Sequence, residues 1–107
     1  MHYSIIIISN IPIENKFNNS LLINNNNLSI IDENTLKVNN ELIYFYYLIL
    51  NINIENSLNL MKDNNKYVTN CFHQTSIDNI FAIGESSSSS KDIKFQLEDI
   101  YDFLINN

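Results

Sequence analysis

The only glycine of the chain stands at the end of a short apolar stretch near the C-terminus, and this junction limits what the backbone can do there. Residues 80–83 read Ile-Phe-Ala-Ile, and Gly84 and Glu85 follow directly. Glycine adopts positive φ at little cost and lets other groups approach the backbone closely. The pattern therefore predicts a buried strand that ends where the chain turns or meets a neighbour.

A second strand pattern, at residues 3–8, begins a layout that is typical of dinucleotide-binding folds. Its sequence, Tyr-Ser-Ile-Ile-Ile-Ile, predicts a central parallel strand buried on both faces. A turn starts at Ser9, residues 14–23 have the length of a helix, and residues 28–32 read as a strand that ends on Asp32. Strand, turn, helix, strand and acid is the order of a βαβ nucleotide site.

Three further patterns complete the expected fold. Residues 42–50 are apolar and aromatic, which predicts a core strand, and residues 35–38 predict a short strand that joins it through a turn at residues 39–40. Residues 91–105 carry apolar side chains on one helical face, which predicts a C-terminal amphipathic helix. We expect one α/β domain with a small, Rossmann-like, mostly parallel sheet and flanking helices.

Two segments resemble the FAD-binding motifs of thioredoxin reductases. Residues 66–85 are similar to the last flavin-contacting segment of that family, in which Thr-Ser, a turn, an apolar-Phe-Ala-x-Gly strand and an acid follow one another. Residues 3–32 resemble its N-terminal FAD motif. The resemblance implies that residues 1–107 are a single, reduced FAD-domain-like unit without the NADPH domain. It also implies a set of positions for any bound nucleotide: Ser9, Asn10, Pro12, Asp32, Gly84 and Glu85.

The same comparison shows departures at the positions that would touch a phosphate. Ser9, Ile11 and Glu14 stand where the family has glycine. A branched side chain at Ile11 fills the place of the pyrophosphate, and a carboxylate at Glu14 opposes an anion at a helix N-terminus. We therefore expect no bound cofactor, while FAD or an adenine nucleotide remains the alternative.

The chemistry of the reductases is not expected from this chain. It contains one cysteine, Cys71, so the redox Cys-x-x-Cys is missing together with the nicotinamide domain. The sequence predicts a non-catalytic, degenerate relative that acts as a binding or structural accessory of a larger assembly. The alternative is a small protein that binds FAD or an adenine nucleotide.

Charge indicates what kind of partner such a protein would have. Six Lys and Arg stand against twelve Asp and Glu, for a formal net charge of −6. Nucleic-acid binding needs clustered basic residues, so we expect no sequence-specific contact with nucleic acid. The expected partner is a larger protein or ribonucleoprotein assembly with a basic surface. No signal peptide or membrane span is recognised, and a lone cysteine fits a reducing compartment, so a soluble, cytoplasmic protein is expected.

Three further features of the sequence predict no catalytic or binding role. Cys71 and His73 are too few to hold zinc, so no metal site is expected. The five serines at residues 86–90 predict a flexible loop. Asparagine makes up about a fifth of the chain, and most of these residues are expected to have no individual role.

Overall fold

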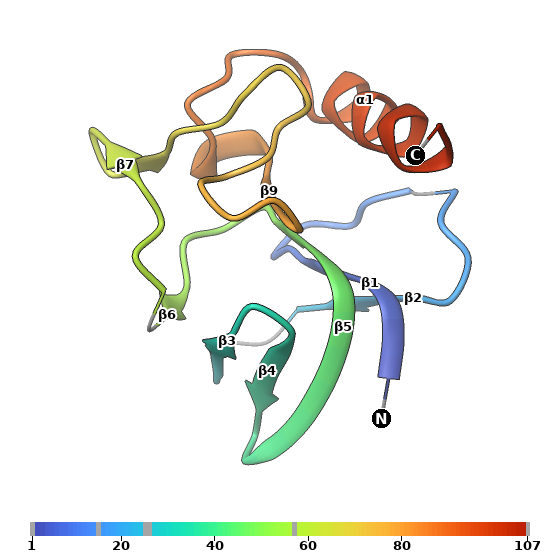
Figure 1. Cartoon of the computed structure of the whole chain (residues 1–107), viewed down its shortest axis with the longest axis vertical. Helices are drawn as coiled ribbons and strands as arrows, with labels where there is room; N and C mark the ends of the chain where they lie inside the picture. The colour runs from blue at the N-terminus through green and yellow to red at the C-terminus, as the bar shows by residue number, and fades with distance from the viewer. Residues whose placement is uncertain (1, 15, 25–26, 57, 107) are drawn as a thin grey trace.

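A ten-residue strand, β5 (Glu41–Leu50), lies at the centre of a mixed sheet (Figure 1). The computed structural model describes residues 2–14, 16–24, 27–56 and 58–106. The strands of the sheet follow the order β2-β1-β5-β4-β3-β6, and β9 also pairs with β5. The elements besides β5 are β1 (His2–Ile8), β2 (Ser20–Ile23), β3 (Leu28–Asp32), β4 (Thr35–Val38), β6 (Glu55–Asn56), β7 (Lys62–Asp63), β8 (Lys66–Tyr67), β9 (Ile80–Ala82), the 3₁₀ turn η1 (Gly84–Ser86) and α1 (Ile93–Ile105).

One half of the sheet is parallel. β1 pairs in parallel with β2 on one side and with β5 on the other, and β9 continues this direction beyond β5. Ile6 and Ile8 enter the core on one face, whereas Ile5 and Ile7 enter the core on the opposite face. Burying each of these side chains stabilises the fold by about 1.5–3 kcal/mol. The predicted central parallel strand at residues 3–8 is confirmed.

The other half of the sheet is antiparallel except at its edge, where β6 pairs in parallel with β3. β4 pairs with the first residues of β5 and with β3, both in the antiparallel direction. Asn39 and Asn40 form the turn between β4 and β5, with φ of 50° and 70°. Positive φ at both central residues is the geometry that a two-residue hairpin needs. The hairpin predicted at residues 39–40 and the core strand predicted at residues 42–50 are both confirmed.

The C-terminal helix covers one face of the parallel half (Figure 1). Leu97 and Ile100 of α1 are buried against Ile5, Ile49 and Phe81 of three adjacent strands. The predicted amphipathic helix is thus confirmed, with its first residue at Ile93. Its packing closes the second core of the protein.

The predicted helix-flanked, mostly parallel Rossmann-like sheet is wrong. The helix expected at residues 14–23 is replaced by an irregular loop at residues 9–14 and 16–19, followed by the strand β2. Asparagine and serine are poor helix formers, and the Leu-Leu-Ile run after Ser20 pairs instead with β1. β3, expected as the second parallel strand, therefore lies in the antiparallel half. The sheet is mixed, and α1 is the one α-helix among the described residues.

Asparagine supplies the left-handed backbone positions that other proteins give to glycine. Apart from Gly84 and His73, every described residue with positive φ is an asparagine: Asn19, Asn39, Asn40, Asn64 and Asn65. Asparagine tolerates this region better than other L-residues because its short amide can bond locally. The expectation that most asparagines have no individual role is therefore wrong for these five residues, which lie in three turns.

The hairpin turn offers a direct test of this role. Replacing Asn40 with alanine should destabilise the protein by about 1 kcal/mol, because the left-handed region costs other L-residues roughly 1–2 kcal/mol. Replacing Asn40 with glycine should instead keep or slightly raise stability, since Asn-Gly is the preferred sequence of this turn. Urea unfolding followed by circular dichroism measures both changes.

The matched control is Asn59→Ala, an exposed asparagine outside the strands and without positive φ. It should change the free energy of unfolding by less than about 0.5 kcal/mol. Equal effects at Asn40 and Asn59 would contradict the assigned role of the turn.

Candidate functional site

The carboxyl ends of the three central parallel strands meet at one edge of the sheet. The amide of Asn51 donates to the carbonyl of Ile8 at 2.8 Å, and that of Ile83 donates to Leu50 at 2.8 Å. In open α/β sheets this edge is where ligands bind. Two residues predicted from the sequence, Ser9 and Gly84, follow β1 and β9 here and lie on either side of β5.

Asn51 joins these two positions. Its Nδ2 donates to Oγ of Ser9 at 2.9 Å, and its Oδ1 would lie 2.0 Å from a Cβ added to Gly84. Gly84 also has φ of +59°, and its amide donates to Oε1 of Gln96 on α1 at 2.8 Å. Glycine is thus required twice over, by conformation and by space. The close approach expected at the only glycine is present, and the neighbour is the Asn51 side chain.

Ser9 is occupied by its own loop as well as by Asn51. Its Oγ donates to the carbonyl of Ile11 at 2.8 Å and lies 3.1 Å from the Ile11 amide. The side chain is buried, as is that of Asn51. Ser9, Asn51 and the Ile11 backbone therefore satisfy one another within the chain.

The other predicted positions are not part of this network. Asn10 and Pro12 are exposed in the loop after β1, and Glu85 is exposed in η1.

Asp32 lies at the opposite end of the sheet. Asp32 pairs with Thr35 of β4, and Thr35 pairs with Tyr44 of β5. Tyr44 precedes Asn51 by seven residues, so the two ends of the sheet are roughly 20 Å apart at about 3.3 Å per residue. Oδ1 of Asp32 accepts the amide of Asn34 at 2.8 Å, and this bond, with one to Thr35, lowers the pKa of the carboxyl. It shapes the turn between β3 and β4.

The loop predicted at residues 86–90 begins with two buried, hydrogen-bonded serines, Ser86 and Ser87. Oγ of Ser86 lies 2.8 Å from the carbonyl oxygens of both Leu50 and Ile83, which share its one O–H donor. Ser87 is buried and bonds Thr69, and the Ser88 amide donates to Tyr67. Small hydroxyl side chains fit because they bond backbone carbonyls in a crowded place.

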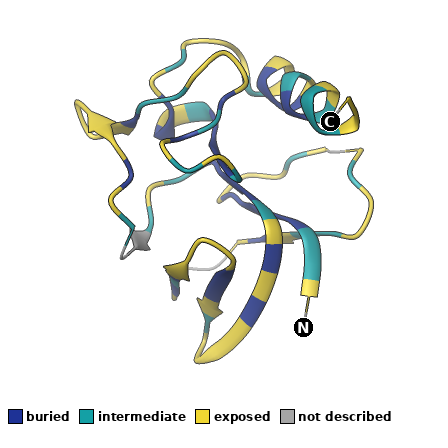
Figure 2. Ribbon diagram, viewed as in Figure 1, coloured by how far each residue is buried: buried dark blue, intermediate teal, exposed yellow. Residues whose placement is uncertain are grey.

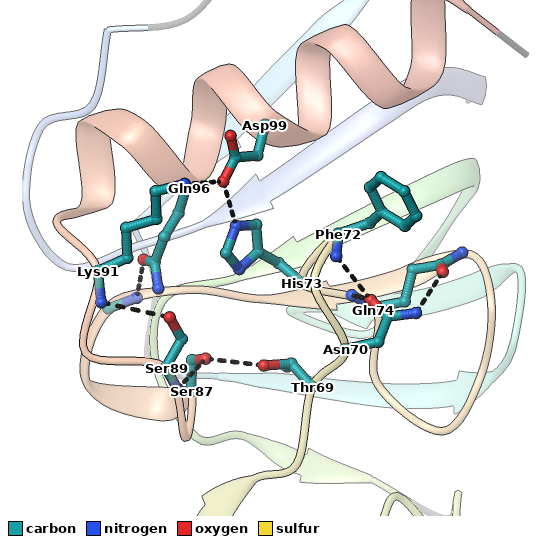
Figure 3. A network of polar contacts seen from close by, with 11 residues as sticks. Thr69, Asn70, Phe72, His73, Gln74, Ser87, Ser89, Lys91, Gln96 and Asp99 are labelled. Carbon is teal, nitrogen blue, oxygen red and sulfur yellow. Dashed lines mark hydrogen bonds and ion pairs between the residues drawn. The ribbon is translucent and has the colours of Figure 1, made fainter.

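A buried histidine connects the loop before β9 to α1 (Figure 3). Nε2 of His73 lies 2.9 Å from Oδ2 of Asp99, which also accepts Nζ of Lys91 at 2.6 Å. These two bonds, that of Lys91 first, lower the pKa of the Asp99 carboxyl. An ionised Asp99 can only accept, so Nε2 of His73 carries the proton. The cluster fastens α1 to the loop.

The same place carries a local energetic cost. His73 has φ of +68°, and its Nδ1 is buried without a partner among the described residues. Nε2 of Gln96 is in the same situation. A buried, unsatisfied polar group costs about 1–3 kcal/mol, and Asp99 offsets part of that cost.

A groove of about 780 Å³ lies between the loop after β1 and α1. Its floor is apolar, and its rim carries both charges. It is lined by Ile11, Pro12, Ile13, Glu14, Lys16, Phe17, Ile93, Lys94, Leu97, Glu98, Tyr101 and Asp102. Its three carboxylates and two lysines leave it with a small excess of negative charge.

The outer side of β5 presents a row of apolar side chains to solvent. Leu42, Tyr44 and Tyr46 are exposed by 48%, 42% and 59%, and they alternate with buried Ile43 and Phe45 (Figure 2). We call these three residues the tyrosine face. Large side chains exposed together in this way mark a candidate interaction surface.

Within the described ranges, no three His, Cys, Asp or Glu side chains gather in a way that could hold a metal ion. No helix of those ranges is both long and apolar enough to cross a bilayer.

Comparisons of the chain with family models, curated proteins and solved structures found no match. The resemblance to thioredoxin reductases therefore stays a prediction from the residues alone.

The contact between Gly84 and Asn51 leads to a stability prediction. Gly84→Ala should destabilise the protein by at least about 2 kcal/mol, because it adds left-handed strain to a clash with Asn51. Thermal unfolding measures the loss. Ser90→Ala, an exposed change in the same segment, is the control and should be close to neutral. A neutral Gly84→Ala would contradict the tight contact.

The bonds of Asp99 predict a dependence of stability on pH. The folded-state pKa is lowered, so the contribution is present above the unfolded value near 3.8 and is lost as pH falls through the folded value. Asp99→Asn should cost about 0.5–1 kcal/mol at neutral pH and nothing at about pH 2, since the pair is partly exposed. The measurement is urea unfolding at several pH values.

Asp102→Asn removes the same charge one turn later on α1 and serves as the control. Its effect should not follow the acid transition of Asp99. If Asp99→Asn and wild type lost stability in parallel below pH 4, the assigned bonds would be contradicted.

Proposed function

We propose that this chain is a non-catalytic binding module that joins a larger assembly through the tyrosine face. The observation that carries the proposal is the exposure of Leu42, Tyr44 and Tyr46 on one side of the central strand. Tyrosine is enriched at protein interfaces because it buries a large area while its hydroxyl stays wet or bonded. A row of such side chains on rigid strand backbone loses little entropy on binding.

The surroundings of the tyrosine face support a basic partner. Three exposed acids, Asp32, Glu33 and Glu41, lie on β3, on the turn after it and on β5. The sheet register places one cation, Lys37 of β4, beside Leu42. The net charge of −6 adds a long-range attraction to basic surfaces. A protein or ribonucleoprotein surface rich in Lys and Arg is the proposed counterpart.

The proposed module works without flavin. Supporting observations are the distance of Asp32 from the edge that holds Ser9 and Gly84, and the loop that replaces the helix expected after β1. A pyrophosphate relies on a helix N-terminus and free backbone amides at that place. Here the Ile11 amide is paired with Ser9.

The proposal predicts where a partner contacts the chain. With a photo-crosslinking phenylalanine analogue at Tyr44, we expect crosslinks to a basic protein in native extract. The double variant Tyr44→Ala, Tyr46→Ala should weaken association at least about tenfold, because interfaces concentrate energy in a few aromatic side chains. The variant should stay folded, with a loss of stability of at most about 2 kcal/mol, since both side chains are partly exposed and Tyr46 also contacts the His2 ring.

The matched control places the analogue at Phe95, which is 48% exposed on α1. Crosslinking at Tyr44 should exceed that at Phe95 and should fall with added salt, which screens exposed charges. A free monomer on a sucrose gradient at low salt, without crosslinks at Tyr44, would contradict the proposal.

A further inference from the structure

A hollow lies beside β5 between the two strands, β4 and β9, that pair with the same edge of it. Along one edge, β5 pairs with β4 as far as Tyr44 and with β9 from Leu48 onward. The hollow between these two partners has a volume of about 730 Å³. Its lining consists of Glu33, Asn34, Tyr46, Tyr47, Ser76, Ile77, Asp78 and Asn79. It adjoins the tyrosine face through Tyr46.

Two asparagines close the floor of this hollow. The Asn79 amide group donates to the carbonyls of Glu33 at 2.7 Å and of Tyr46 at 2.9 Å. Nδ2 of Asn34 donates to the carbonyl of Phe45 at 3.2 Å, and the Phe45 amide donates back to Asn34. The backbone groups between β4 and β9 are therefore satisfied. An occupant is not needed to complete the sheet, so any ligand is selected by the walls and the rim.

The walls and the rim favour a cation. Two carboxylates, Glu33 and Asp78, lie at the hollow, and no Lys or Arg lines it. Neither carboxylate takes part in an ion pair within the described part of the chain. Tyr46 and Tyr47 also line the hollow, while their rings contact His2 and Phe81, respectively. This surface therefore repels anions and leaves two acids without a counter-charge.

We propose that the hollow receives an arginine side chain of the partner, an inference that rests on the function proposed above. Arginine is favoured over lysine because its planar guanidinium has five N–H donors and can donate to two carboxylates at once. The volume exceeds that of one side chain, so flanking residues of the partner segment also fit. In this arrangement the tyrosine face provides the buried contact area, and the hollow makes the interface specific for arginine.

The test uses the whole chain and a small probe. N-acetyl-arginine methylamide is titrated into ¹⁵N-labelled protein at low salt, and backbone amide shifts are recorded. We expect shifts at residues that line the hollow, and weaker ones with the lysine analogue. The citrulline analogue, which has the same shape without the charge, should give none. The double variant Glu33→Gln, Asp78→Asn should weaken binding about five- to tenfold.

The matched control is Glu14→Gln with Glu98→Gln, which removes the same charge from the groove beside α1. It should leave the shifts unchanged. Shifts that map outside the hollow, equal responses to arginine and citrulline, an equal response to lysine, or no response would each overturn the arginine assignment. Probe binding without any crosslinked partner would support the arginine site and contradict the proposed assembly function. A partner crosslinked at Tyr44 without probe binding would support the assembly function and contradict the arginine site.

Discussion

The edge of β5 that faces β4 and β9 has to satisfy two partners that run in opposite directions. β4 pairs with β5 up to Tyr44 and β9 pairs with it from Leu48, so in the described part of the fold the residues between them have no strand partner on that edge. Asn34 and Asn79 cover this stretch by donating their side-chain amide groups to the carbonyls of Phe45 and Tyr46. This arrangement lets one strand serve both halves of the sheet and leaves the hollow between β4 and β9.

Elements with strong local patterns could be predicted. The isoleucine run of β1, the aromatic run of β5, the Asn39-Asn40 turn and the apolar face of α1 each carry a signal within their own residues. The helix expected at residues 14–23 failed because length and position in a familiar layout outweighed its poor helix formers. Because that segment forms β2, it occupies the place beside β1 that was predicted for residues 28–32. Those residues form β3 in the antiparallel half instead. A single wrong element thus changed the fold class.

The candidate site was predictable to the extent that it depended on strand ends. Ser9 and Gly84 come together because the carboxyl ends of parallel strands share an edge. Asp32 does not join them, since its place depended on the fold of the intervening segment. Asn51 was missed because nothing in a chain so rich in asparagine marks one of them as buried. The strained His73 was missed for a related reason: a left-handed, buried histidine leaves no trace in spacing or periodicity.

The backbone separates two reasons for using glycine that are usually found together. At Asn39, Asn40, Asn64 and Asn65 the chain needs positive φ but has room for a side chain, and asparagine suffices. At Gly84 the Asn51 side chain leaves no room, and glycine is kept. Asparagine therefore serves where the backbone conformation alone is demanding, whereas no larger residue can enter at position 84 unless the Asn51 side chain moves.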